Sequence, residues 1–182
     1  IEEISKKIKT KNGMILHSSG TTGKDAVSNP LNFGVCYPLQ TFSFNKKIDF
    51  TKTPILIEGN SQKSLEKLKE LCRILEVEFE EVDSKKRLHY HLAASFANNF
   101  TNHILSLTDE LVNKFKLEKK FFIPIANETF KKFQSNKSKE SQTGPAVRND
   151  VKTLKKHEEI LKKSNYLNLY KIITKSIKKN DL

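Results

Sequence analysis

Residues 53–82 read TPILIEGNSQKSLEKLKELCRILEVEFEEV and carry the clearest secondary-structure signals of the chain. The apolar run 53–59 ends at a glycine, which is typical of a buried strand. Residues 61–77 have leucines at helical spacing and predict an amphipathic helix, with Ser61 as its N-cap. Residues 77–82 alternate and predict a half-exposed strand. The helix residues predicted to face inward are Leu65, Leu68, Leu71, Cys72 and Leu75.

The sequence before residue 53 predicts two further strands. Residues 14–17, MILH, form a short apolar run that is typical of a buried strand. Residues 33–42 are apolar and aromatic but contain Pro38, which favours an edge strand or a strand followed by extended chain. Residues 1–9 read as the end of a helix without an initiator methionine, so we expect a fragment that begins part-way through a fold.

The character of the sequence changes near residues 83–84. Beyond that point no stretch has a convincing strand pattern, and the apolar residues recur at helical spacing. The predicted strands and helices alternate in residues 1–83, which predicts an α/β half-domain. Residues 84–182 are predicted as helices alone, which indicates an all-α domain. The predicted helices of the second domain cover residues 84–117, 121–135, 146–163 and 166–179.

The composition of the 182 residues excludes several classes of protein. No apolar run approaches the roughly 18 residues that span a bilayer. The net charge of +12 comes almost entirely from lysines interleaved with glutamates, a pattern of solvated helix faces, so nucleic-acid binding is not favoured. Cys36 and Cys72 lie far apart with no ligand spacing, so we expect neither a metal site nor a disulfide framework. A reducing cytoplasm is the expected setting.

Residues 17–27, HSSGTTGKDAV, resemble a phosphate-binding loop at first sight. The Walker pattern fails because Gly20 and Gly23 are too close together, and Asp25 stands where serine or threonine is required. We therefore expect no ATP site. Ligands of open α/β sheets lie beyond the carboxyl ends of strands, and His17, Ser18 and Gly20 stand where the strand 14–17 ends. These residues are candidates to line a substrate or nicotinamide site; the alternative is a purely structural loop.

A polar stripe lies along the predicted helix 84–117. On a wheel of about 100° per residue, His91, Ser95, Asn98 and Asn102 fall together beside an apolar face. Buried polar groups without partners cost about 1–3 kcal/mol each, so this stripe needs a ligand, water or another chain. It predicts either a substrate pocket facing the α/β half or a polar helix–helix interface. The residues predicted to form the adjoining core face are Leu92, Phe96, Asn99, Phe100, His103 and Leu107.

Residues 141–150, SQTGPAVRND, form a second candidate site. Gly144 and Pro145 precede a predicted helix whose N-terminal N–H groups would favour an anion. Arg148 can clamp a carboxylate or phosphate through two nitrogens, and Asp150 can orient Arg148. The alternative is an ordinary helix cap with a surface ion pair.

Five strings together resemble a bacterial family of Rossmann-like proteins that carry the C-terminal domain of unknown function 2520. The strings are HSSG (17–20), GVCYPLQTFS (34–43), IEGN (57–60), HLAASFANNFTNH (91–103) and QTGPAVRND (142–150). That family is related to pyrroline-5-carboxylate reductase, ketopantoate reductase and 6-phosphogluconate dehydrogenase. The resemblance implies that residues 1–83 are the C-terminal portion of a Rossmann-like domain. It also implies that residues 84–182 resemble the C-terminal domain of 6-phosphogluconate dehydrogenase, which serves for substrate binding and dimerisation.

The resemblance implies a hydride transfer between NADP or NAD and a small anionic C=O or C=N compound. The glycine-rich GxGxxG pattern for the dinucleotide is absent from this chain, as expected if a leading segment is missing. A ligand-binding or sensor protein that forms homodimers but has no catalytic activity is the alternative. We predict as catalytic residues His91, Ser95, Asn98 and Asn102, as substrate residues Gly144, Pro145, Arg148, Asp150 and Gln40, and as cofactor residues His17, Ser18 and Gly20.

Overall fold

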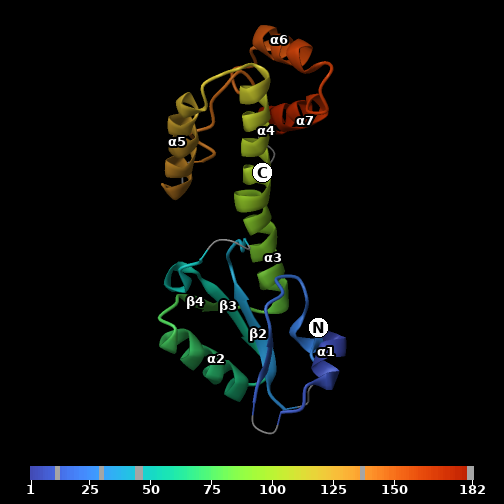
Figure 1. Cartoon of the computed structure of the whole chain (residues 1–182), viewed down its shortest axis with the longest axis vertical. Helices are drawn as coiled ribbons and strands as arrows, with labels where there is room; N and C mark the ends of the chain where they lie inside the picture. The colour runs from blue at the N-terminus through green and yellow to red at the C-terminus, as the bar shows by residue number, and fades with distance from the viewer. Residues whose placement is uncertain (11–12, 29–30, 44–46, 136–137, 180–182) are drawn as a thin grey trace. The chain divides into compact units, whose positions relative to one another are not determined.

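The computed structural model divides the chain into two compact units, Ile1–Leu111 and Val112–Leu182 (Figure 1). All described strands lie in the first unit, and the described part of the second is helical. The long helix that follows Asp83 is therefore grouped with the sheet over most of its length. The described residues are 1–10, 13–28, 31–43, 47–135 and 138–179.

A four-stranded mixed sheet forms the centre of the first unit, with its strands side by side in chain order. The first and second strands are parallel, the second and third antiparallel, and the third and fourth parallel. Each strand falls inside a stretch that the sequence predicted as strand. The strands are β1 (Ile15–His17), β2 (Phe33–Pro38), β3 (Ile55–Gly59) and β4 (Phe79–Glu81).

The second strand, β2, is internal, so the edge-strand reading of Pro38 is wrong and the alternative reading is confirmed. Pro38 is the last residue of β2 and lies opposite Ile55 of β3. On the other side, β1 pairs with β2 only as far as Val35. Pro38 therefore lies beyond the ladder with β1, where its missing N–H breaks no hydrogen bond of that pair.

The helix α2 (Gln62–Ile74) covers the sheet and supplies much of the core. The hydroxyl of Ser61 accepts a hydrogen bond from the Ser64 N–H at 3.2 Å, which confirms the predicted N-cap. The residues of α2 that pack with Ile55, Ile57 and Val77 are Leu65, Leu68 and Cys72. Burial raises the pKa of the free Cys72 thiol to about 11, so it remains protonated.

The inward prediction is wrong for Leu71 and Leu75, which are 36% and 41% exposed. Leu71 is rotated about 100° from Cys72 around the helix, away from the sheet. Leu75 is the C-cap and lies beyond the last turn that packs on the strands.

The predicted long helix 84–117 is helical as far as Lys114 but contains a π-helical turn. It consists of α3 (Ser84–Ala94), the π turn η3 (Ser95–Phe100) and α4 (Thr101–Lys114). The Asp83 carboxylate caps α3 by accepting from the Lys86 N–H at 2.6 Å. A π turn contains about one extra residue, so side chains after it are rotated by about 100° relative to a regular helix.

The apolar face predicted for this helix is largely exposed rather than in the core of the chain. Leu92, Phe96 and Phe100 are 57%, 61% and 53% exposed, whereas Leu107 is buried. Phe96 and Phe100 contact each other edge-on, with ring centroids 4.9 Å apart, but both rings are exposed on the surface of the first unit. The prediction that these residues are buried in the core is therefore wrong for Leu92, Phe96 and Phe100.

The second unit contains α5 (Ile123–Gln134), α6 (Val151–Leu161) and α7 (Leu167–Lys179). Its buried apolar side chains include Val112, Ala146, Leu154 and Leu161. Nδ1 of His157 lies 2.9 Å from the hydroxyl of Tyr170, which joins α6 to α7. The shorter helical segments of the chain are α1 (Glu2–Lys7), η1 (Lys24–Ala26), η2 (Phe50–Lys52) and η4 (Lys119–Phe121).

The start of α6 differs from the predicted start near Pro145. Residues 145–149 form turns, and φ is positive at Gly144 before them (+110°) and at Asn149, their last residue (+52°). The Asp150 carboxylate accepts from the Thr153 N–H at 3.0 Å and from its hydroxyl at 2.7 Å, so Asp150 is the N-cap. The Asp150 cap places the first helical residue, Val151, six residues after Pro145.

Within the described ranges, no helix has both the length and the apolar character needed to cross a membrane.

Candidate functional site

The loop after β1 is held together by the buried imidazole of His17, the last residue of that strand. Nδ1 of His17 accepts from the Ser19 N–H at 3.2 Å, and Nε2 lies 3.3 Å from the Gly23 carbonyl oxygen. Because a carbonyl can only accept, the proton of the neutral ring is on Nε2. Burial lowers the pKa of His17, which favours this neutral form. Both ring nitrogens are therefore occupied by the loop itself.

A buried ion pair anchors the far end of this loop to β3 and α3. The Arg87 guanidinium is 1% exposed, and its Nη1 donates to Glu58 Oε2. Its Nη2 donates to the Thr22 carbonyl at 2.6 Å. The Ser84 hydroxyl donates to Glu58 Oε2 at 2.8 Å, and Lys24 Nζ lies 3.3 Å from Oε1. The ion pair therefore holds residues 22–24 in place, through Arg87 at Thr22 and through Glu58 at Lys24.

The charge of Glu58 is maintained by these contacts. Burial alone raises the pKa of the Glu58 carboxyl, but the hydrogen bonds from Arg87 and Ser84 and the charge of Arg87 outweigh it. The pKa is consequently below its ordinary value, and Glu58 is ionised at neutral pH. Among the side-chain atoms of the described residues, Nε of Arg87 is buried without a hydrogen-bond partner.

Gly20, Tyr37 and His91 meet at one point. The Tyr37 hydroxyl lies 3.1 Å from Nδ1 of His91, and the two rings are edge-on with centroids 6.1 Å apart. A Cβ on Gly20 would lie 2.7 Å from His91 Nδ1 and 2.9 Å from Tyr37 Cζ, so a larger residue does not fit. Since β1 and β2 are parallel, the loop after β1 and Tyr37 near the end of β2 lie at the same edge of the sheet.

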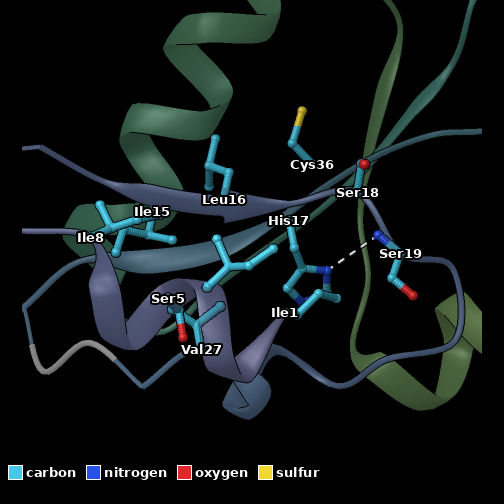
Figure 2. A pocket seen from close by; sticks show the side chains of 11 residues that line it. Ile1, Ser5, Ile8, Ile15, Leu16, His17, Ser18, Ser19, Val27 and Cys36 are labelled. Carbon is cyan, nitrogen blue, oxygen red and sulfur yellow. Dashed lines mark hydrogen bonds between the residues drawn. The ribbon is translucent and has the colours of Figure 1, made fainter.

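A pocket of about 490 Å³ opens on β1 and its loop (Figure 2). His17, Ser18 and Ser19 supply polar groups to it, and the hydrogen bond from Ser19 to His17 lies along its wall. Most of the other lining side chains are aliphatic, from β1 and α1. Two of the predicted cofactor residues, His17 and Ser18, therefore line a largely apolar pocket.

The other predicted residues of the first unit are less enclosed. Ser95 is half-buried and donates to the His91 carbonyl at 3.0 Å, while Asn98 and Asn102 are exposed. Gln40 is exposed just after β2, and its side-chain oxygen accepts from the Thr41 N–H at 2.9 Å. The structure thus places His91 with Gly20, and does not enclose Asn98, Asn102 or Gln40.

The predicted anion site of the second unit has a different local structure from the one expected. Arg148 is exposed and precedes α6, and its N–H donates to the Gly144 carbonyl at 3.3 Å. Hydrogen bonds from the Thr153 N–H and hydroxyl lower the pKa of Asp150, and the charge of Arg148 contributes. An ionised Asp150 covers the start of α6, so the expected helix N-terminus open to an anion at Gly144 and Pro145 is wrong. Arg148 as an anion-binding cation stays a prediction.

Sequence reasoning missed Tyr37, Glu58 and Arg87 as site residues. Two signals were present. Glu58 is the one charged residue in the apolar run 53–59, and Arg87 is an arginine in a lysine-rich chain. A charge within a buried strand requires a partner, which is a reason to look for an arginine elsewhere in the sequence.

Comparison with known proteins places the chain in a family. A family model described as a domain of unknown function, DUF2520, matches residues 53–177. A solved structure described as a candidate NADP oxidoreductase from Bacteroides fragilis is 33% identical, with a TM-score of 0.85 over 91% of this chain and 65% of that chain. A Thermotoga maritima protein is 20% identical and shares the fold, with a TM-score of 0.75 over 98% of this chain and 72% of its own.

No curated protein matches the sequence significantly. The chain spans about two thirds of the Bacteroides fragilis protein. The family model matches well over half of the residues of this chain. The first unit is an α/β Rossmann-like unit, and helices follow it. The chain belongs to the DUF2520 family.

Proposed function

We propose that this chain carries the substrate side of an NADP- or NAD-dependent oxidoreductase that acts on a small anionic C=O or C=N compound. The observation that carries the proposal is the half-buried His91 imidazole against Gly20 and Tyr37, where β1 and β2 end. The description of the Bacteroides fragilis relative as a candidate NADP oxidoreductase supports the same reading.

The residues present fit the nicotinamide end of a dinucleotide and not its phosphates. His17 and Ser18 line an apolar pocket, and Gly20 lets the His91 and Tyr37 rings approach the loop that carries them. No GxGxxG pattern is present in the chain to hold a pyrophosphate. The bound cofactor would supply or accept the hydride.

The chain's own residues would position the substrate and move a proton. His91 would give a proton to the substrate oxygen or nitrogen as the hydride arrives, because an imidazole transfers protons readily near neutral pH. His17 would hold the loop that presents Ser18 and Gly20, since its ring nitrogens are engaged there. The substrate, or an ordered water, would be contacted by Ser95, Asn98, Asn102 and Gln40.

The test uses the protein produced from the whole reading frame in which this chain occurs. We expect it to enhance or quench NADPH fluorescence, and to oxidise NADPH in a screen of small anionic carbonyl and imine compounds. Absence of NADPH and NADH binding would overturn the proposal. Dinucleotide binding without turnover would favour the alternative, a ligand-binding or sensor protein.

We further propose that Arg148 binds the anionic group of the substrate. Replacing Arg148 by alanine is expected to raise KM about tenfold or more, since a charge-assisted hydrogen bond is worth about 1.5–3 kcal/mol. The thermal unfolding midpoint should not change, because Arg148 is exposed. Arg73→Ala, which removes an exposed arginine of α2, is the charge-matched control. Arg73→Ala should leave KM unchanged, and an unchanged KM in Arg148→Ala would contradict the proposal.

We also propose that two copies of the chain associate through the exposed apolar stripe of the long helix. The stripe is formed by Leu88, Leu92, Phe96, Phe100 and Ile104, all exposed. A continuous apolar surface on one helix is typical of an interface. Phe96→Glu should convert a dimer to a monomer in light scattering after gel filtration. Ile74→Glu, at an exposed position of α2, should leave the mass unchanged; a wild-type monomer would contradict the proposal.

A further inference from the structure

We propose that Tyr37 is a positioning residue that fixes the proton of neutral His91 on Nε2. The inference rests on the proposed function only for its catalytic consequence. The tautomer itself is a property of the folded chain and can be measured without a substrate.

The geometry of the Nδ1 edge leads to this assignment. The Tyr37 hydroxyl, 3.1 Å from Nδ1, is the described side chain that hydrogen-bonds to the ring, and the Gly20 backbone closes the adjacent space. Burial raises the pKa of Tyr37, so the phenol keeps its proton at neutral pH. A phenol that donates to Nδ1 leaves the ring proton on Nε2. The reverse tautomer would direct Nδ1–H at the phenol oxygen and leave the phenol proton without an acceptor among the described residues.

The neighbouring His17 shows why His91 is the imidazole that can hydrogen-bond to a ligand. Nδ1 of His17 accepts from the Ser19 N–H, and donation from the Tyr37 hydroxyl gives Nδ1 of His91 the same role, so both rings carry the proton on Nε2. Nε2–H of His17 is directed at the Gly23 carbonyl and is occupied. No hydrogen bond joins Nε2 of His91 to any residue in the described part of the chain. Tyr37 thus leaves His91 with a protonated Nε2 available to a ligand.

The experiment is nuclear magnetic resonance of protein labelled with ¹⁵N-histidine, at a pH where the imidazoles are neutral. Long-range proton–nitrogen correlations distinguish protonated from unprotonated ring nitrogens, and the spectrum of His91→Gln assigns the His91 signals. In the wild type we expect Nδ1 of His91 to be unprotonated and Nε2 protonated. In Tyr37→Phe we expect the two nitrogen shifts to move toward each other, because the Nδ1–H tautomer becomes populated.

Tyr90→Phe is the matched control, since the Tyr90 hydroxyl is on the same helix but bonds to Glu80. It should leave the His91 signals unchanged. A protonated Nδ1 in the wild type, or His91 shifts that do not respond to Tyr37→Phe, would overturn the inference.

A kinetic readout distinguishes this inference from the proposed function. With a turned-over substrate, Tyr37→Phe should lower kcat about fivefold to tenfold, the effect of one hydrogen bond, and leave KM unchanged. If no substrate is turned over, the proposed function fails while the resonance experiment still tests the tautomer. If kcat falls equally in Tyr90→Phe, the effect of Tyr37 is structural and the positioning role is wrong.

Discussion

Replacing Arg87 by methionine is expected to lower the free energy of unfolding by about 3–5 kcal/mol, the usual effect of removing one partner of a buried ion pair. The side chain is 1% exposed and donates to Glu58 and to the Thr22 carbonyl. The variant leaves the Glu58 carboxylate in the interior without its guanidinium. It also releases the loop that carries Ser18 and Gly20. Urea unfolding followed by circular dichroism measures the loss.

Two further variants isolate the ion pair from the other effects of the substitution. Arg73→Met changes an exposed arginine and should alter the free energy of unfolding by no more than about 0.5 kcal/mol. Combining Glu58→Leu with Arg87→Met should restore part of the loss, because the buried carboxylate is then removed as well. A loss below about 1 kcal/mol in Arg87→Met would contradict the view that this network is essential for the fold.

The effect of Arg87→Met should depend on pH with a definite sign. In the folded wild type the pKa of Glu58 is lowered, so the pair stabilises the protein above the unfolded pKa of about 4.3. That stabilisation disappears as the pH falls through the lower, folded pKa. The difference in stability between wild type and Arg87→Met should therefore be largest near neutral pH and shrink in acid.

Local signals in the sequence were sufficient for the sheet and its covering helix. The strand β3 and the helix α2 have distinct hydrophobic periods, and Ser61 has the chemistry of an N-cap next to them. Asp150 carries an equally local signal before the apolar face of α6. The prediction instead starts the helix after the Gly144–Pro145 pair, because proline is common in the first turn of a helix. The capping carboxylate of Asp150 is the stronger determinant of the start.

The ion pair and the π turn could not be predicted from local patterns. Glu58 and Arg87 are 29 residues apart, and the sequence around Arg87 reads as a solvated helix face. Only the packing of α3 on the sheet places the guanidinium beside the carboxylate. The π turn involves bonds from the Ser95 hydroxyl to the His91 carbonyl and from Thr101 to Phe96. A wheel with constant angle has no means of representing it.

Replacing His91 by glutamine is expected to lower kcat by about 10²–10⁴-fold, the usual contribution of a general acid. Glutamine retains a polar group that can hydrogen-bond to the Tyr37 hydroxyl, so the local packing against Gly20 is kept. It cannot release a proton near neutral pH. The kcat of the variant should therefore fall while binding of NADPH remains within about threefold.

His89→Gln supplies the control for this substitution. His89 is exposed on the same helix, two residues away, and the change removes an imidazole without touching Tyr37 or Gly20. We expect its kcat and its pH profile to match the wild type. If instead His91→Gln retains kcat within threefold, the proton must come from another group or from water. His17 is then a poor substitute, because its Nε2–H is already donated to the Gly23 carbonyl and its release would open the loop.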